Sequence, residues 1–193
     1  MKHLPVTVPL IALVTLSGPA LAGSMAPVTD PVVPAPIPLS QEWTGPYIGV
    51  ELGFGDVTAS SPNAQLGGDG MLYGITLGYD RDFGNWVLGL AIDYDRTDIS
   101  LGGTDVDSIA RLKLRAGVDL GDGLLYAVAG GARAETSVLG SDTGWTAGVG
   151  YEHRLSEHWS LGGEALYHEF KNFNGTGIDV DGTTVAIRAL YRF

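Results

Sequence analysis

The sequence predicts an all-β protein built as an eight-stranded antiparallel transmembrane up-and-down β-barrel. From Trp43 onward, apolar residues recur at every second position and show no helical period. The connections between these segments alternate between short and long, which is typical of antiparallel strands joined by hairpins. Only 17% of the residues are charged, against roughly 25% in soluble domains. We therefore expect half of each strand to face away from water.

Residues 1–22 have the features of a cleaved secretory signal peptide. Lys2 and His3 form a short basic start, an uncharged apolar run covers residues 4–16, and Ala20 and Ala22 form a small-x-small cleavage site. The apolar run is shorter than the roughly 20 residues that a transmembrane helix needs. The chain has no cysteine, which excludes a lipoprotein anchor, a disulfide framework and a cysteine nucleophile.

Residues 23–42 are predicted to form an extended periplasmic linker. This segment carries prolines at positions 27, 31, 34, 36 and 38, among alanines and valines. Such a composition favours a polyproline-like spacer over a folded unit. The barrel domain is predicted for residues 43–193.

Eight segments of the barrel domain alternate between an apolar and a polar face, as half-buried strands do. They cover residues 48–54, 73–80, 86–95, 111–119, 126–135, 145–154, 159–168 and 184–193. The predicted short connections are 82–85, 121–123 and 156–158. The predicted long connections are 58–69, 97–107, 136–142 and 171–182. An even number of strands, with short turns at one end and long loops at the other, is typical of transmembrane barrels.

The apolar face is predicted to point into lipid, although a soluble barrel would show the same alternation with its faces inverted. The polar face is rich in glycine between its charges, which makes room for long side chains in a narrow lumen. The central apolar stripes carry no charge, as a bilayer requires. In the segment 126–135, this reasoning places the even-numbered residues from Tyr126 to Ala132 toward lipid, and Arg133 and Glu135 toward the lumen.

The 17 aromatic residues are predicted to form two girdles, one at each membrane–water interface. The ten assigned to the short-turn end are Trp43, Tyr47, Tyr79, Phe83, Trp86, Tyr126, Tyr151, Trp159, Tyr191 and Phe193. The seven assigned to the long-loop end are Phe54, Tyr73, Tyr94, Trp145, Tyr167, Phe170 and Phe173.

The first strand opens with Trp43-Thr44-Gly45-Pro46-Tyr47-Ile48-Gly49, and the last ends with Leu190-Tyr191-Arg192-Phe193. With the leader and the proline-rich lead, these motifs resemble the small eight-stranded outer-membrane barrels of the OmpA-like and opacity-type superfamily, in particular the porin-like surface antigens of alphaproteobacteria. The resemblance covers residues 43–193. It implies a place in the Gram-negative outer membrane, contact with its lipid and lipopolysaccharide, and recognition of Tyr191 and Phe193 by the barrel-assembly machinery. Full OmpA relatives also have a periplasmic peptidoglycan-binding domain, which we expect to be absent here because no residues remain after the last predicted strand.

Charged residues on the predicted lumen face are nearly balanced. The eight acids are Glu51, Asp80, Asp93, Asp95, Asp119, Glu135, Glu152 and Glu164. The seven bases are Arg111, Lys113, Arg115, Arg133, Arg154, Arg188 and Arg192. Eight strands leave room for side chains and little more, so we expect an internal salt-bridge network that plugs the barrel. This predicts a structural role in envelope integrity.

Two other functions fit the same pattern. The first is a small low-conductance channel, in which Arg111, Lys113 and Arg115 would form a positive constriction. The second is a surface adhesin or receptor ligand that contacts host or surface partners through the predicted loops 58–69 and 171–182. The oligomeric state is left open by the sequence.

The sequence gives little support for nucleic-acid binding, lipid A deacylation or calcium binding. The net charge of −11 argues against nucleic-acid binding. His158-Trp159-Ser160 is similar to the His-x-Ser motif of outer-membrane lipid A deacylases, but it is predicted at the periplasmic end, away from the outer leaflet. Residues 179–182 resemble part of a calcium loop without its first and last acidic ligands. We therefore predict no enzyme activity, no cofactor and no metal site, although divalent cations bridging the acidic loops to lipopolysaccharide phosphates stay open.

Overall fold

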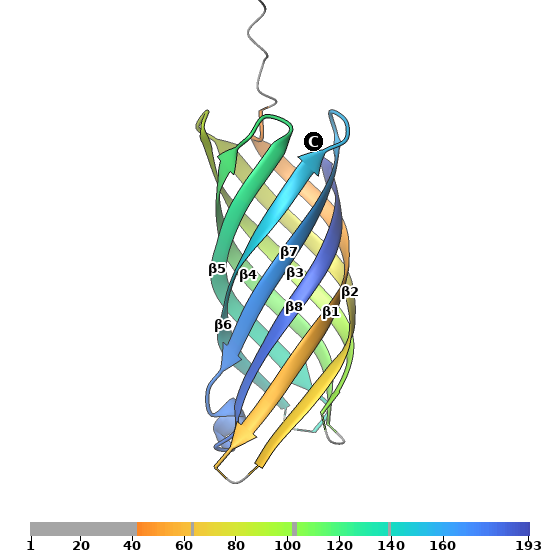
Figure 1. Ribbon diagram of the computed structural model, residues 1–193, viewed down its shortest axis with the longest axis vertical. Helices are drawn as coiled ribbons and strands as arrows, with labels where there is room; N and C mark the ends of the chain where they lie inside the picture. The colour runs from red at the N-terminus through yellow and green to blue at the C-terminus, as the bar shows by residue number, and fades with distance from the viewer. Residues whose placement is uncertain (1–41, 63, 102–103, 139) are drawn as a thin grey trace, which may run out of the picture. The chain divides into compact units, whose positions relative to one another are not determined.

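The computed structural model describes residues 42–62, 64–101, 104–138 and 140–193, which form a closed barrel of eight antiparallel strands (Figure 1). The strands are β1 (Gly45–Ser61), β2 (Ala64–Asp82), β3 (Trp86–Leu101), β4 (Thr104–Asp119), β5 (Gly123–Thr136), β6 (Gly140–Arg154), β7 (Trp159–Phe170) and β8 (Asp179–Arg192). A short 3₁₀ turn, η1 (Phe173–Gly175), lies between β7 and β8. The predicted fold class is confirmed. The predicted signal peptide, with Ala20 and Ala22, and the linker up to residue 41 lie outside the described residues.

Pairing between β1 and β8 closes the barrel. A closed barrel suits lipid because hydrocarbon offers no partner to the backbone groups of an open strand edge. The closing register sets Glu51 opposite Arg188, and the register of β3 and β4 sets Asp93 opposite Arg111. Neighbouring strands therefore bring opposite charges together. Within the described residues, no helix is long and apolar enough to cross a membrane.

The polar face points inward and the apolar face outward, as predicted. On β4, Lys113 is 1% exposed, whereas the adjacent Leu114 is 65% exposed. On β8, Arg188 is 1% exposed and the adjacent Ile187 is 62% exposed. An inward charged face with an outward aliphatic face is the arrangement of a barrel in lipid and the reverse of a soluble one.

Strand β5 has the opposite phase from the one predicted. Tyr126 and Ala132 are buried inside the barrel, and the Arg133 side chain is 57% exposed on the outside. The prediction failed because small residues such as Ala127 and Ala129 make up the outward face. With weakly apolar residues on both faces, the hydrophobic pattern of β5 does not determine which face meets lipid.

The prediction of two girdles was wrong for five aromatic residues, which are buried: Trp43, Tyr47, Tyr126, Phe170 and Phe173. Tyr47 and Glu51 lie an even number of positions apart on β1, so both side chains point inward. The alternation of the strand therefore determines the direction of Tyr47, although it lies near the strand end, where a girdle was predicted. Other members of the girdles do face outward, and Trp159 is 53% exposed. Inward aromatics therefore lie at both ends of the lumen.

Three of the four predicted long loops are strand extensions. The pairing runs to Ser61–Ala64 between β1 and β2, to Leu101–Thr104 between β3 and β4, and to Thr136–Gly140 between β5 and β6. In these extensions the inward residues Ile99 and Val106 are buried, whereas the outward Asp98 and Asp105 are exposed. The apolar face is therefore the inward one here, and the pattern of the lipid-facing strands does not continue although the hydrogen-bond ladder does. The fourth segment, between Phe170 and Asp179, is irregular and contains η1.

Candidate functional site

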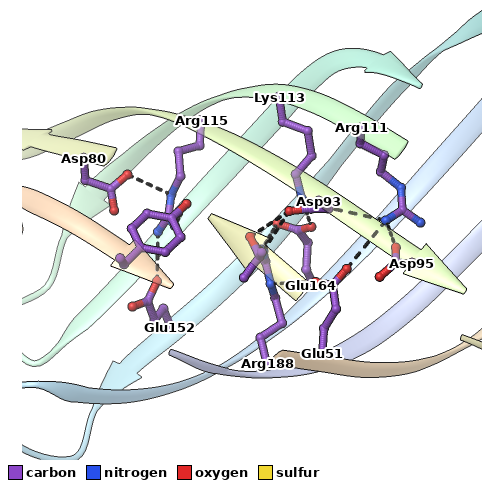
Figure 2. A network of polar contacts seen from close by, with 12 residues as sticks. Glu51, Asp80, Asp93, Asp95, Arg111, Lys113, Arg115, Glu152, Glu164 and Arg188 are labelled. Atoms are coloured by element: carbon purple, nitrogen blue, oxygen red, sulfur yellow. Dashed lines mark hydrogen bonds and ion pairs between the residues drawn. The ribbon is translucent and has the colours of Figure 1, made fainter. Parts of the chain in front are cut away.

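Among the residues that the structure describes, eleven charged side chains of the lumen form two clusters along the barrel axis. The loop-side cluster contains Glu51, Asp93, Asp95, Arg111, Lys113, Glu164 and Arg188. The turn-side cluster contains Asp80, Arg115, Glu152 and Arg192. Figure 2 shows the charged groups of the loop-side cluster converging from strands on opposite walls of the barrel.

Arg188 and Lys113 form the centre of the loop-side cluster. Arg188 lies 3.0 Å from Glu51, 2.7 Å from Glu164 and 3.2 Å from Asp93. Lys113 Nζ lies 2.5 Å from Asp93 Oδ2 and contacts Glu164 from the other side. Two carboxylates are thus shared by two cations that come from β4 and β8.

Arg111 completes the loop-side cluster toward the long-loop end. Its guanidinium contacts Asp95 and lies 3.6 Å from Glu51 and 3.9 Å from Asp93. Thr76 adds neutral hydrogen bonds: its hydroxyl donates to Asp93 at 2.7 Å and accepts from Arg188 at 2.6 Å. The side chains of Arg111 and Glu51 are 1% and 3% exposed, so this pair is shielded from water.

The turn-side cluster is a compact square of two arginines and two carboxylates. Arg115 lies 3.4 Å from Asp80 and 3.0 Å from Glu152. Arg192 lies 2.8 Å from Asp80 and 2.9 Å from Glu152. Ser160 donates a 2.6 Å hydrogen bond to Glu152. Because each arginine touches both carboxylates, each buried charge has two opposite partners.

Aromatic rings enclose the two arginines of the turn-side cluster. The Arg115 guanidinium lies 4.1 Å from the centre of the Tyr126 ring, and it donates a 3.1 Å hydrogen bond to the Tyr47 hydroxyl. Arg192 lies 4.8 Å from the centres of the Trp43 and Tyr47 rings. These are cation–π distances, and such contacts strengthen when water is excluded.

Glycines make the space for these rings. Gly78 lies opposite Tyr47 across β1 and β2, and Gly150 lies opposite Tyr126 across β5 and β6. A Cβ atom at either glycine would overlap the tyrosine ring. The glycine content of the polar face is therefore explained here by the packing of the lumen.

The net charge of the two clusters is small. The loop-side cluster has three bases and four acids, and the turn-side cluster has two of each. Every base, including Arg111, Lys113 and Arg115, contacts at least two carboxylates. A ladder of bases neutralised in this way lacks the unpaired positive field that would draw anions into a pore.

Four of the fifteen predicted lumen charges lie outside the two clusters. Asp119 accepts a 3.2 Å hydrogen bond from Trp43 Nε1, and the Arg154 guanidinium lies 4.5 Å from the centre of the Trp43 ring. Both therefore surround the tryptophan at the short-turn end. Arg133 and Glu135 point outward and lie 4.0 Å apart.

Sequence reasoning missed the neutral partners of the network. Thr76 and Ser160 hydrogen-bond to Asp93 and Glu152, and both lie at inward positions of their strands in the sequence alternation. Tyr47 likewise shares the inward phase of Glu51. Within the described residues, no three or more histidine, aspartate or glutamate side chains form a group that could hold a metal ion.

The sequence and the structure have counterparts among known proteins. Residues 9–193 match the model of the family described as outer membrane protein beta-barrel domain. The chain belongs to this outer-membrane β-barrel family. The resemblance to small outer-membrane barrels inferred from the motifs at Trp43–Gly49 and Leu190–Phe193 is thereby confirmed, and so is localisation in the outer membrane.

The chain is 30% identical over 188 residues to the 25 kDa outer-membrane immunogenic protein of Brucella canis, which covers 90% of this chain and 86% of that protein. It is 25% identical over 217 residues to the 31 kDa outer-membrane immunogenic protein of Brucella melitensis, covering 86% and 90% respectively. The crystal structure of Neisserial surface protein A aligns with a TM-score of 0.56 and 18% identity, over 78% of this chain and 98% of that one. The last similarity shows a shared fold.

Proposed function

We propose that this outer-membrane protein is a structural component of the cell envelope whose lumen is closed by its own charge network. The observation that supports this most strongly is the pairing inside the barrel. The five bases of the two clusters all contact buried carboxylates, and none of the eleven charged residues is more than 6% exposed. An eight-stranded barrel has little interior space beyond its side chains.

The ends of the barrel fit this role. Short turns face the periplasm and longer connections face the outside in bacterial barrels of this kind, so the β7–β8 segment would lie at the cell surface. Trp43 is fully buried at the short-turn end and packs against Arg154 and Arg192. The lumen is then closed by an aromatic residue toward the periplasm as well as by ion pairs at its centre.

The outer surface supports contact with lipid and with the assembly machinery. Large apolar residues such as Ile92 and Leu114 are more than half exposed on the outside, and burial in acyl chains would remove them from water. Phe193 is 72% exposed and lies against Tyr191 at 5.1 Å. An exposed aromatic pair at the end of the last strand would be accessible to the machinery that inserts barrels.

The proposal excludes a catalytic role. His158 is placed in the turn between β6 and β7, where its ring stacks on Tyr191 at 5.5 Å between centroids. That position is at the short-turn end, far along the barrel from the outer leaflet where lipid A would be attacked. Stacking on a girdle residue accounts for the histidine without invoking a general base.

A surface-binding role is the second candidate. The matching Brucella proteins are called immunogenic, and the β1–β2 hairpin of this chain extends to Ser61 and Ala64. The extended β1–β2 hairpin and the hydrogen-bonded β7–β8 segment would present surfaces to a host or surface partner. Deleting residues 60–65 would abolish adhesion if this role holds and would leave the structural role intact.

Loss of envelope integrity in a deletion strain tests the main proposal. We expect increased leakage of a periplasmic reporter and greater sensitivity to detergent, both restored by the wild-type gene and by a gene that lacks residues 60–65. Normal leakage and normal detergent resistance in the deletion strain would contradict a structural role. Restoration by the wild-type gene alone would show that residues 60–65 are needed for envelope integrity, against the expectation that closure of the lumen is sufficient.

A further inference from the structure

The barrel also contains a cavity, which lies between the charge network and the long-loop end. A cavity of about 210 Å³ is lined there by residues from six of the eight strands and from the β7–β8 segment. Its walls are apolar and include Val57, Val106, Ile109, Ala134, Phe170 and Val180. The cavity is thus a small, mainly apolar space inside the barrel, next to the loop-side cluster of charges.

The β7–β8 segment forms the roof of this cavity. Phe173 is 2% exposed and packs on Phe170 with 6.0 Å between ring centroids. The segment is held by hydrogen bonds from Phe173 N to Ile178 O at 2.7 Å and from Asn172 N to Asp179 Oδ1 at 2.8 Å. Asn174 N also donates to Asp142 on β6 at 3.1 Å. An ordered roof makes the cavity a preformed site.

One polar atom in the wall lacks a partner. His168 lines the cavity and is 4% exposed. Its Nε2 lies 3.1 Å from the Thr184 hydroxyl, whereas Nδ1 is buried with no hydrogen-bond partner. A buried polar atom without a partner is costly, and a polar group of a ligand bound in the cavity that His168 lines would satisfy it.

We propose that this cavity binds a small uncharged molecule that is mainly apolar and carries one hydroxyl group, such as a substituted phenol. The apolar walls favour an uncharged ring or short chain. An apolar cavity of about 150 Å³ is known to accept benzene, so about 210 Å³ accommodates one ring with small substituents. A hydroxyl both donates and accepts, so it pairs with His168 Nδ1 in either tautomer of the ring.

Ligand binding to purified protein in nanodiscs tests this site, with 4-fluorophenol as the probe, fluorine NMR as the readout and empty nanodiscs as the reference. We expect saturable binding above that of empty nanodiscs. Ala134→Phe fills the cavity and should weaken binding at least tenfold. Ala129→Phe is the matched control, because Ala129 lies on the same strand and faces outward, and it should bind like the wild type.

The hydroxyl contact has its own test. One hydrogen bond changes affinity by roughly twofold to tenfold, so fluorobenzene should bind more weakly than 4-fluorophenol by that factor. His168→Leu should remove the difference between the two probes. Equal affinity of both probes for the wild type would overturn the assignment of His168.

The cavity proposal itself is overturned if the wild type takes up no more probe than empty nanodiscs, or if Ala134→Phe binds as well as Ala129→Phe. The gel mobility of unboiled samples shows whether each variant is folded. If Ala134→Phe does not fold, Val106→Phe fills the same cavity from β4 and carries the same expectation. Binding at equilibrium is independent of conductance, so this test does not depend on the closure of the lumen.

Discussion

Removal of Arg188 is the perturbation that most directly tests the energetics of the charge network. Arg188→Met takes away a guanidinium that lies within 3.2 Å of three carboxylates, those of Glu51, Asp93 and Glu164. Its side chain is 1% exposed, so water does not replace the lost contacts. The loop-side cluster changes from three bases and four acids to two bases and four acids.

The expected cost follows from leaving buried charges unpaired. Removing one partner of a buried ion pair destabilises proteins by about 3–5 kcal/mol. At about 1.4 kcal/mol per factor of ten, this lowers the folding equilibrium constant by roughly a hundredfold to several thousandfold. Arg133→Met is the matched control. Its side chain is 57% exposed and its ion pair with Glu135 spans 4.0 Å, so we expect less than about 1 kcal/mol.

A double variant separates charge imbalance from lost packing. Arg188→Met with Glu51→Gln leaves two bases and three acids, which restores the net charge of −1 that the cluster has with three bases and four acids. Because neutralising both partners of a buried pair is often nearly neutral, we expect this variant to recover most of the lost stability.

The assay is urea unfolding in lipid vesicles, followed by tryptophan fluorescence and by gel mobility. Arg188→Met should lower the free energy of unfolding by about 3–5 kcal/mol. A cost within about 1 kcal/mol of that of Arg133→Met, the range of exposed pairs, would refute the reasoning, since the pairs in the lumen would then behave like ion pairs at the surface.

Three further outcomes are expected. Gly78→Ala should destabilise the barrel by about 1–3 kcal/mol in the same urea assay, because the added Cβ overlaps the Tyr47 ring. Gly67→Ala, which has nothing within 4 Å, should change stability by less than about 0.5 kcal/mol, and equal effects would contradict the packing role of Gly78. Phe173→Ser should loosen the β7–β8 segment and speed tryptic cleavage after Lys171, whose side chain is 75% exposed. The control Val138→Ser, at a site 68% exposed, should be cleaved like the wild type, and an unchanged rate in Phe173→Ser would show that the roof does not depend on this ring. Phe193→Ala should slow assembly in cells, measured as the fraction of heat-modifiable protein, while leaving unfolding in vesicles unchanged because Phe193 is 72% exposed. Normal assembly of this variant would show that Phe193 is not part of the assembly signal.

The sequence was sufficient for the strand number, the short turns and most of the lumen charges, because aliphatic residues mark the lipid side of seven strands. It failed on β5, where Ala127 and Ala129 make the outward face almost as weakly apolar as the inward one. It also failed beyond the bilayer, where the β1–β2 ladder continues to Ser61 and Ala64 without any apolar alternation to mark it.

The sequence did not predict which charged residues pair across the lumen. The contact between Lys113 and Glu164 joins strands β4 and β7 across the lumen, and no local pattern connects two positions so far apart in the chain. The cavity beside His168 likewise depends on how the β7–β8 segment folds over the mouth of the barrel. Both features follow from closure and tertiary packing.

Single-channel recording in planar bilayers tests the closure of the lumen most directly. The purified wild-type protein is first shown to be folded by its gel mobility. We then predict no reproducible conductance steps, because every base of the two clusters is paired with buried carboxylates. A porin in the same bilayer serves as the positive control. Reproducible steps from the wild type, with an amplitude or ion selectivity changed by Lys113→Glu, would contradict closure and assign the lumen to a pore.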